Sequence, residues 1–352
     1  MKQSGYRVVL IGGSSLLGKE LQAVLEDRVF PVSSLKTVED ERTEPELPLL
    51  NIGKTPRQTF EYEEEIPEDC DFAFVAAPDE RLGRWYERLK SCGSPNFRTV
   101  IDLSSRACGA ANADLRIPFL DRAPTADQDR RAGPEPWVIV SPHTAAIIIS
   151  ALMVRLHARF PLRRAVAQLF SPASEIGLRA IDELQKQTVN LLSFQKIPHE
   201  VFGGQIAFNL LPRLKAAAEE ADSLEARLRS QLQAYLGDRV PLPALRLFQV
   251  PVFYSIALSL YVETQERVAP VDLVAALEGP PLKIRRNSER PPSQVEAAGS
   301  NDILVDAIEP DATCPAGIWL WAVADNLRLA AINAVQIAES VLARRQPLNL
   351  HR

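Results

Sequence analysis

The chain opens with a strand-like run that leads directly into a glycine turn, and this feature constrains the fold more than any other. Residues 6–11 are apolar except for Arg7 and stop at Gly12-Gly13-Ser14-Ser15, after which residues 16–25 repeat apolar side chains at helical spacing. We therefore predict a strand, a tight turn and a helix. Similar apolar runs predict further strands at residues 35–38, 71–77, 99–103 and 137–140. This alternation favours a parallel sheet with helices on both faces.

The glycine turn is a candidate dinucleotide-binding site. Amides at a helix N-terminus can hold a pyrophosphate, and glycines let the backbone approach it. The segment reads Gly12-Gly13-Ser14-Ser15-Leu16-Leu17-Gly18, with Ser15 in place of the middle glycine of the usual form, so we expect binding of NAD or NADP to be weakened or lost. The alternative is that the glycines serve only a tight turn and close helix packing.

Acidic residues after the second strand bear on the choice of cofactor. Asp40, within Glu39-Asp40-Glu41, lies where a carboxylate would accept the ribose 2′-hydroxyl of NAD and repel the 2′-phosphate of NADP. If a dinucleotide binds, this position favours NAD. The alternative is a solvated acidic loop.

The length of the chain predicts a second domain. The chain has 352 residues, 46% of them hydrophobic, and it is longer than the chains that usually fold around a single hydrophobic core. Predicted helices cover residues 145–156, 214–236 and 325–344, predicted strands cover 165–170, 248–253 and 258–263, and 280–300 is predicted as a surface loop. We place a dinucleotide-binding domain at residues 1–140, an α+β domain with a mixed sheet at 141–322, and a C-terminal helical segment at 323–352.

Composition argues against several functions. The formal net charge of -5 gives no basic field for nucleic acid or an anionic membrane, so a small molecule or a protein is the expected partner. The sequence lacks a signal-peptide pattern and any apolar window near ~20 residues, so we expect a cytoplasmic protein. Its four cysteines form no CxxC pair and its four histidines lie apart from them, so we expect no metal site.

Several short motifs, in order along nearly the whole chain, resemble the aspartate-semialdehyde dehydrogenase family. They are Phe30-Pro31-Val32, Ile101-Asp102-Leu103-Ser104-Ser105, Ser174-Glu175-Ile176-Gly177, Ala207-Phe208-Asn209, Val250-Pro251-Val252-Phe253 and Asp325-Asn326-Leu327-Arg328. The resemblance implies a Rossmann-type dinucleotide-binding domain, an α+β catalytic and dimerisation domain, a C-terminal helix that packs back on the first domain, and a homodimer. It also implies cofactor contacts from Ser104, Ser105 and Asn326.

The family's chemistry requires two residues that this chain lacks. Its members reduce aspartyl phosphate with NADPH, using a cysteine thiolate as nucleophile and a histidine to move protons. Thr144, within Ser141-Pro142-His143-Thr144, occupies the cysteine position, and a hydroxyl is a far weaker acid than a thiol with a pKa near ~8.5. Ile256 occupies the histidine position and cannot transfer a proton.

Three functional hypotheses follow. The favoured one is a non-catalytic, dimeric homologue kept for binding, regulation or scaffolding. The second is an active NAD(P)-dependent oxidoreductase or acyl-transfer enzyme that uses Thr144 and His143, which requires those side chains to meet within hydrogen-bond reach. The third, within the non-catalytic class, is a dinucleotide sensor that binds NAD without chemistry. A thiol from Cys314 would have to be recruited from the far end of the second domain.

Overall fold

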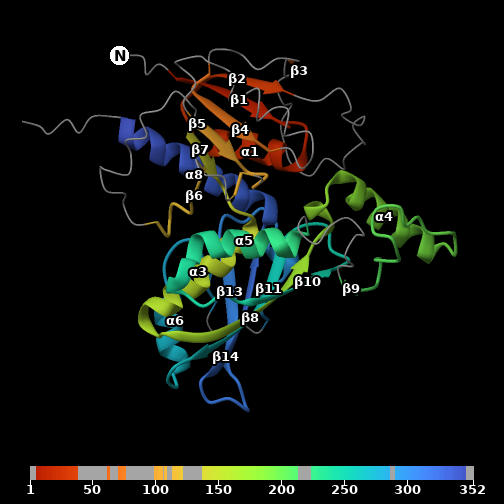
Figure 1. The fold of residues 1–352 in the computed structure, drawn as a ribbon. Helices are drawn as coiled ribbons and strands as arrows, with labels where there is room; N and C mark the ends of the chain where they lie inside the picture. The colour runs from red at the N-terminus through yellow and green to blue at the C-terminus, as the bar shows by residue number, and fades with distance from the viewer. Residues whose placement is uncertain are drawn as a thin grey trace, which may run out of the picture.

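The computed structural model describes residues 5–38, 62–63, 70–76, 99–105, 107–108, 113–121, 137–212, 223–285 and 290–345. Asp40 and residues 214–222 of the helix predicted at 214–236 lie outside these ranges. Within them, the chain forms two sheets, one above the other in Figure 1, and this agrees with the predicted fold class. Among the described residues, no helix is long and apolar enough to cross a membrane.

The first sheet is parallel throughout, in the order β3-β2-β1-β4-β5-β7-β6. Its strands are β1 (Tyr6–Ile11), β2 (Val32–Val38), β3 (Tyr62–Glu63), β4 (Phe72–Val75), β5 (Thr99–Asp102), β6 (Ala113–Leu115) and β7 (Trp137–Val140). The central strands β4 and β5 are buried at every residue, which is typical of a parallel sheet covered on both faces. The predicted strands at 35–38, 71–77, 99–103 and 137–140 are confirmed.

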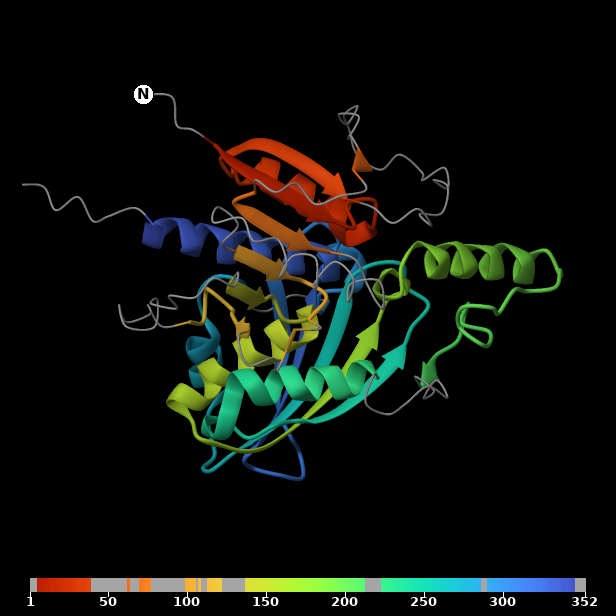
Figure 2. The same cartoon turned by 45° about the horizontal axis from the view of Figure 1, so that its top comes forward.

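Two helices that lie far apart in sequence cover one face of this sheet. Helix α1 (Leu16–Asp27) follows the glycine turn, and helix α8 (Asn326–Arg345) ends the described chain. Both contribute apolar side chains to a core with β1, β4, β5 and β7, including Leu21 of α1 and Val335 of α8. In Figure 2 the blue α8 runs beneath the red and orange strands, so the last helix closes the first domain.

The second sheet is mixed, in the order β12-β13-β14-β11-β8-β10-β9. Its strands are β8 (Leu162–Ser171), β9 (Leu211–Pro212), β10 (Ala244–Gln249), β11 (Ile256–Thr264), β12 (Leu282–Ile284), β13 (Ile303–Pro310) and β14 (Gly317–Ala324). The central strands β8, β11 and β14 pair antiparallel and alternate between a fully buried face and a partly exposed one. That alternation is typical of a sheet with helices packed on one side.

Three helices cover one face of the second sheet, which we call its inner face. They are α3 (Thr144–Arg159), α5 (Leu224–Leu236) and α6 (Pro270–Leu277), which share one core with β8, β11 and β14. A short helix, α7 (Gln294–Ala297), packs on β14 at the other face, and the 3-10 turns η1 (Ala173–Glu175) and η3 (Gly237–Arg239) complete the described elements. Helix α4 (Leu178–Leu192) extends away from the body as an arm (Figure 1).

Two sequence predictions for this region were wrong in part. The strand predicted at residues 248–253 ends at Gln249, because Pro251 has no N–H with which to continue a ladder. The segment predicted as a surface loop at 280–300 contains β12 and α7. Helix α7 is only four residues long and is stabilised by a capping box between Ser293 and Glu296. The polar composition of residues 280–300 favoured a loop, so this short helix was not predicted.

Helix α8 is tied to the first domain by charge as well as by apolar packing. The Arg328 guanidinium donates to Glu20 Oε1 at 2.8 Å and to Asp27 Oδ2 at 2.6 Å, both on α1, and to Asn301 Oδ1 at 2.6 Å. Arg28 forms a second bridge, donating to both carboxylate oxygens of Glu339. Bidentate arginine contacts of this kind fix the direction of a helix, so α8 has a defined orientation on α1.

Candidate functional site

Ser15 caps helix α1 inside the glycine turn. Its Oγ accepts a hydrogen bond from Gly18 N at 2.9 Å, and its hydroxyl lies 2.7 Å from Gly12 O and 3.1 Å from Ala76 O. Serine is among the preferred N-cap residues because it satisfies a free helix amide. The serine that replaces a glycine therefore has a role of its own in the turn. Ser14 precedes it, and Leu16 and Leu17 begin α1.

Gly18 and Gly13 are required by packing. A Cβ at Gly18 would lie 2.2 Å from Gly12 O, and a Cβ at Gly13 would lie 2.3 Å from Thr37 Cγ2. Gly12 itself has a φ of 80°, which favours glycine. These glycines serve the tight turn and the close approach of α1, whether or not a nucleotide contacts them.

Ser104 and Ser105 follow β5 at the carboxyl edge of the first sheet, close to the start of the second domain. The buried Asp102 carboxylate accepts hydrogen bonds from Ser104 N at 2.8 Å, from Ser104 Oγ at 2.5 Å and from Ala107 N at 2.9 Å. Ser105 has a φ of 61°, and its hydroxyl donates to Ser141 O at 3.1 Å. Asp102 therefore shapes the loop that carries both serines.

Asp102 gives the first prediction. Burial raises the pKa of its carboxyl above the usual 3.8, although the hydrogen bonds from Ser104 and Ala107 oppose the shift. Above the usual pKa, the folded protein then binds more protons at this group than the unfolded chain does, so its contribution to stability falls as the pH rises through the raised pKa. In urea unfolding from pH 4 upwards, we expect Asp102→Asn to gain stability relative to the unmodified protein as the pH rises. A pH-independent difference between the two proteins would contradict this account.

Thr144 begins helix α3 with its hydroxyl fully engaged. Its Oγ1 donates to the backbone oxygen of Asn326 at 2.6 Å, and the side chain is buried. Asn326 is the first residue of α8. Thr144, the residue predicted to occupy the family's nucleophile position, therefore connects the second domain to the helix that covers the first.

His143 is the N-cap of α3, and its side chain turns to partners other than Thr144. Its Nδ1 accepts a hydrogen bond from Ala145 N at 3.0 Å, which requires a lone pair on that nitrogen. The ring proton then lies on Nε2, 2.5 Å from Glu175 Oε1. Both ring nitrogens of His143 are occupied, and neither is bonded to the Thr144 hydroxyl.

Asn326 is the hub of this cluster. Its Oδ1 accepts hydrogen bonds from Ser174 Oγ at 3.1 Å and from Ser255 N at 3.0 Å, and its Nδ2 donates to Glu175 Oε2 at 3.3 Å. Glu175 therefore joins His143 to Asn326. In the sequence, Glu175 stands out only as part of one motif that resembles the family, and its role as a link was missed. Gln231 was not predicted either: its Oε1 accepts a hydrogen bond from His143 N at 2.9 Å across 88 residues, and no local sequence signal marks such a contact.

Ile256 is fully buried at the start of β11 and belongs to the apolar core of the second domain. Its neighbour Ser255 has a φ of 72°. The hydroxyls of Ser255 and Ser171 are buried without a hydrogen-bond partner, whereas Gln249 Nε2 donates to Ser171 O at 2.9 Å. The position predicted to correspond to the family's histidine is thus occupied by a buried apolar side chain, with the hydroxyls of Ser255 and Ser171 buried as well.

Comparisons with known proteins agree with this architecture. A family model described as semialdehyde dehydrogenase, NAD binding domain, matches residues 7–125, and one described as semialdehyde dehydrogenase, dimerisation domain, matches residues 154–329. Aspartate-semialdehyde dehydrogenase from Aquifex aeolicus is 27% identical over 342 residues, covering 95% of this chain and 97% of the relative. The USG-1 protein homolog of Pseudomonas aeruginosa is 26% identical over 344 residues, with the same coverage of 95% and 97%.

A solved structure is similar over its whole length. The crystal structure of aspartate semialdehyde dehydrogenase II from Vibrio cholerae superposes with a TM-score of 0.82 at 27% identity, covering 96% of this chain and 99% of that chain. The two proteins thus share one overall fold along nearly the whole of both chains. With both family models matched in sequence order, the chain belongs to the aspartate-semialdehyde dehydrogenase family.

Proposed function

We propose that this chain is a non-catalytic member of its family, dimeric and cytoplasmic, which keeps the fold for a binding or regulatory role. The observation that carries the proposal is the hydrogen bond from Thr144 Oγ1 to Asn326 O, which uses the only proton of the hydroxyl at the nucleophile position. A threonine becomes a useful nucleophile only when a base removes that proton. Here the proton serves a contact between domains.

The position of the base supports the same proposal. Ile256 is buried among aliphatic side chains and offers neither a lone pair nor a proton. The alternative, an active enzyme that uses Thr144 and His143, requires His143 to accept the hydroxyl proton. Its Nδ1 lone pair is used by Ala145 N and its Nε2 proton faces Glu175, so the observed hydrogen bonds oppose that alternative.

We further propose that the dinucleotide-binding domain ends at residue 140, that the α+β domain covers residues 141–322, and that the C-terminal segment begins at residue 323. We also propose that the glycine turn, Ser104, Ser105 and Asn326 bind a dinucleotide with weakened affinity. The turn keeps its helix N-terminus, which favours a pyrophosphate, but Ser15 adds a Cβ where the family form has glycine. Asn326 is also committed to Ser174, Ser255 and Glu175. The acidic residue Asp40 favours NAD over NADP.

Nucleotide binding supplies the second prediction. Ser15→Gly removes the obstructing Cβ, so we expect the Kd for NAD in isothermal titration to fall by roughly tenfold, or about 1.4 kcal/mol. Loss of a serine cap in favour of glycine costs only a few tenths of a kcal/mol. Ser223→Gly, the same change at the N-cap of α5, is the matched control and should leave the Kd unchanged. Unchanged binding in Ser15→Gly would contradict the role given to Ser15.

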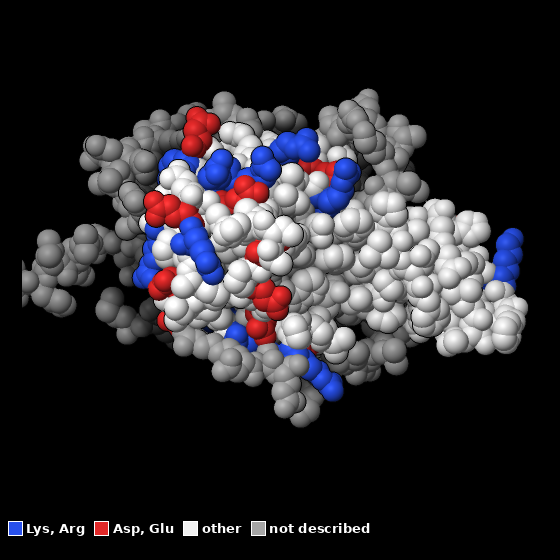
Figure 3. Space-filling model, turned by 90° about the horizontal axis from the view of Figure 1, so that it is seen from below, with Lys and Arg blue, Asp and Glu red and all other residues white. Residues whose placement is uncertain are grey.

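A homodimer through the second domain is the remaining part of the proposal. The matched family model describes residues 154–329 as a dimerisation domain. Large apolar side chains are exposed on and beside α4, namely Val189 (54% exposed), Leu192 (69%), Phe194 (99%), Phe208 (68%) and Phe253 (40%). Seen from below, the surface between the body and the far end of this arm is largely without Lys, Arg, Asp or Glu (Figure 3). Exposed apolar side chains that gather on one surface mark interaction sites.

Turnover is the direct test of the catalytic part. Purified protein is given aspartate semialdehyde, phosphate and either NADP or NAD, and formation of the reduced nucleotide is followed at 340 nm. We expect no turnover above the rate without protein. Product formation would favour the active-enzyme alternative and direct attention to Thr144, His143 and Cys314.

A further inference from the structure

The strand order of the first sheet reverses at β1, and this reversal determines where the two halves of a dinucleotide would lie. Strands β2 and β3 lie on one side of β1, and β4, β5 and β7 lie on the other. In such sheets the pyrophosphate lies at the turn after the first strand, and the adenosine ribose lies beyond the end of the second. The nicotinamide half would therefore lie over the ends of β4, β5 and β7. Strand β7 ends at Val140, and α3 of the second domain begins at Thr144, so this half would lie next to the second domain.

The adenosine side of the first sheet retains hydrogen-bonding groups that the protein does not use. The N–H groups of Leu16 and Leu17, in the first turn of α1, have no partner in the described part of the chain. Thr37, near the end of β2, is 2% exposed, and its Oγ1 is also without a described partner. Its side chain lies against the glycine turn, since a Cβ at Gly13 would lie 2.3 Å from Thr37 Cγ2. Unpaired amides at a helix N-terminus favour phosphate, and an unused hydroxyl can donate to a ligand oxygen.

The serines at the end of β5, on the nicotinamide side, already have partners within the protein. Ser104 Oγ donates to the Asp102 carboxylate, and Ser105 Oγ donates to Ser141 O, which follows β7. A hydroxyl has a single proton, so neither serine retains a donor for a ligand oxygen. A nicotinamide carboxamide would have to replace one hydrogen bond for each one that it gained there. Such an exchange yields little free energy, so we expect these serines to add little to the affinity.

The groups that the second domain contributes at the end of β7 are engaged in the same way. One carboxylate oxygen of Glu175 binds His143 Nε2, and the other accepts a hydrogen bond from Asn326 Nδ2. Asn326 Oδ1 accepts two further hydrogen bonds, from Ser174 and from Ser255. These contacts connect η1, α3 and α8 next to the end of β7. A nicotinamide ring placed there would have to displace contacts that the protein makes with itself.

We propose that the site binds the adenosine diphosphate portion of a dinucleotide and gives the nicotinamide portion no stabilising contact. The inference rests on the weakened dinucleotide binding proposed above, and it places the loss at Ser104, Ser105 and Asn326. The ligand class is then adenosine diphosphates in general, because NAD, NADH and ADP-ribose share the adenosine and the pyrophosphate. A protein with this site responds to the total concentration of these nucleotides and not to the oxidation state of the nicotinamide.

Isothermal titration of the full chain with NAD, NADH and ADP-ribose tests the ligand class. ADP-ribose is NAD without the nicotinamide ring, so we expect its Kd and that of NADH to lie within about threefold of the Kd for NAD. A larger Kd for ADP-ribose, or a larger difference between NAD and NADH, would overturn the inference while leaving dinucleotide binding intact. Absence of binding by all three nucleotides would overturn both the inference and the dinucleotide binding on which it rests.

The Thr37 hydroxyl tests the position of the adenosine half. Thr37→Val replaces the hydroxyl with a methyl group of similar size, and we expect the Kd for NAD and the Kd for ADP-ribose to rise by the same factor, about fivefold. Thr188→Val on α4 is the matched control, because it removes a hydroxyl that donates only to Leu184 O in the described chain, and it should change neither Kd. Unchanged binding in Thr37→Val, or a rise for NAD alone, would overturn the inference. Far-UV circular dichroism verifies that both variants are folded.

Discussion

Gly18→Ala is expected to lower the free energy of unfolding by about 3 kcal/mol or more. A Cβ at this position would lie 2.2 Å from Gly12 O, 2.7 Å from Gly13 Cα and 2.9 Å from Gly13 C. All three are backbone atoms, so no side-chain rotation relieves the clash, and α1 would have to move away from the turn. Urea unfolding followed by circular dichroism measures the loss.

Gly204→Ala is the matched control for this change. A Cβ at Gly204 meets nothing within 4 Å, and its backbone is outside the left-handed region. We expect its stability to remain within about 0.5 kcal/mol of the unmodified protein. If Gly18→Ala were as mild as Gly204→Ala, the close packing of α1 on the turn would not be as described.

Asn326→Ala is expected to cost about 2–4 kcal/mol of stability, because it removes the hub of the buried cluster. The Ser255 N–H, the Ser174 hydroxyl and one oxygen of Glu175 would lose their partner at a site where water is largely excluded, since Asn326 is 4% exposed. The Thr144 contact is made to the backbone of Asn326 and is retained. Thermal and urea unfolding both measure the effect.

Asn190→Ala provides the comparison for a solvated asparagine. Its Nδ2 donates to Lys196 O in an exposed hydrogen bond at the end of the arm. Because water can replace that partner, we expect a loss of at most about 1 kcal/mol. Equal losses at Asn190 and Asn326 would mean that the cluster around Asn326 contributes no more than a surface contact.

The strands and helices with strong apolar periodicity could be predicted from the sequence. Strands β4, β5 and β7 are short runs of buried residues bounded by polar segments, and α3 and α8 have apolar residues at regular helical spacing. Hydrophobic burial determines these elements locally. Where a local signal was weak the prediction failed, as for β12, whose three residues are held by parallel pairing with β13.

Less of the candidate site than of the fold could be predicted from the sequence. The identities at 144 and 256 can be read from the chain, but the partners of Thr144 and His143 cannot. Thr144 meets Asn326 across 182 residues, and His143 meets Glu175 across 32 and Gln231 across 88. Contacts at such separations depend on how α3, α5 and α8 pack together, and nothing in the local pattern around each residue specifies that packing.

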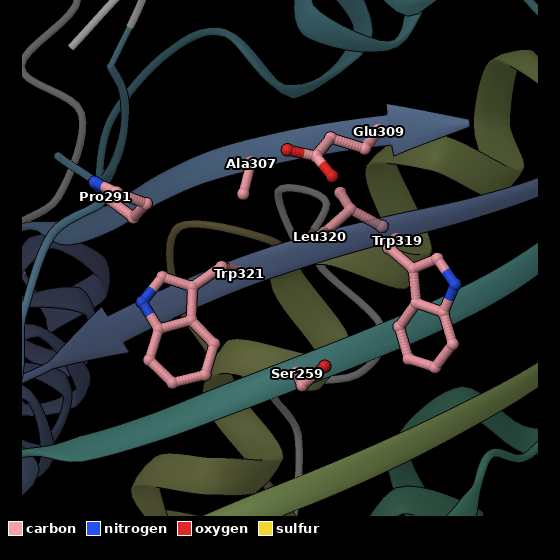
Figure 4. Close-up of a pocket in the computed structure, with 7 residues that line it drawn as sticks. All are labelled: Ser259, Pro291, Ala307, Glu309, Trp319, Leu320 and Trp321. Carbon is pink, nitrogen blue, oxygen red and sulfur yellow. The ribbon is translucent and has the colours of Figure 1, made fainter. Parts of the chain in front are cut away.

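Trp319 and Trp321 show the same limit of sequence-based prediction. Their alternating spacing predicts that both lie on one face of a strand, and the structure places them on the face of the second sheet that α3, α5 and α6 leave open. There the two indoles line a pocket of about 420 Å³ (Figure 4). No sequence pattern indicates a pocket between them, because the pocket depends on the bulge in β13 between Asp306 and Glu309 and on the hydrogen bonds that orient each indole.

The most direct test of the central claim is nucleotide reduction by the unmodified protein supplied with aspartate semialdehyde and phosphate, beside a Thr144→Cys, Ile256→His double variant. We expect no reduction of NADP or NAD by the unmodified protein, since position 144 lacks a thiolate and position 256 lacks a base. Activity gained only in the double variant would show that those two positions limit the chemistry. Turnover by the unmodified protein, abolished by Thr144→Val or His143→Ala, would contradict the account.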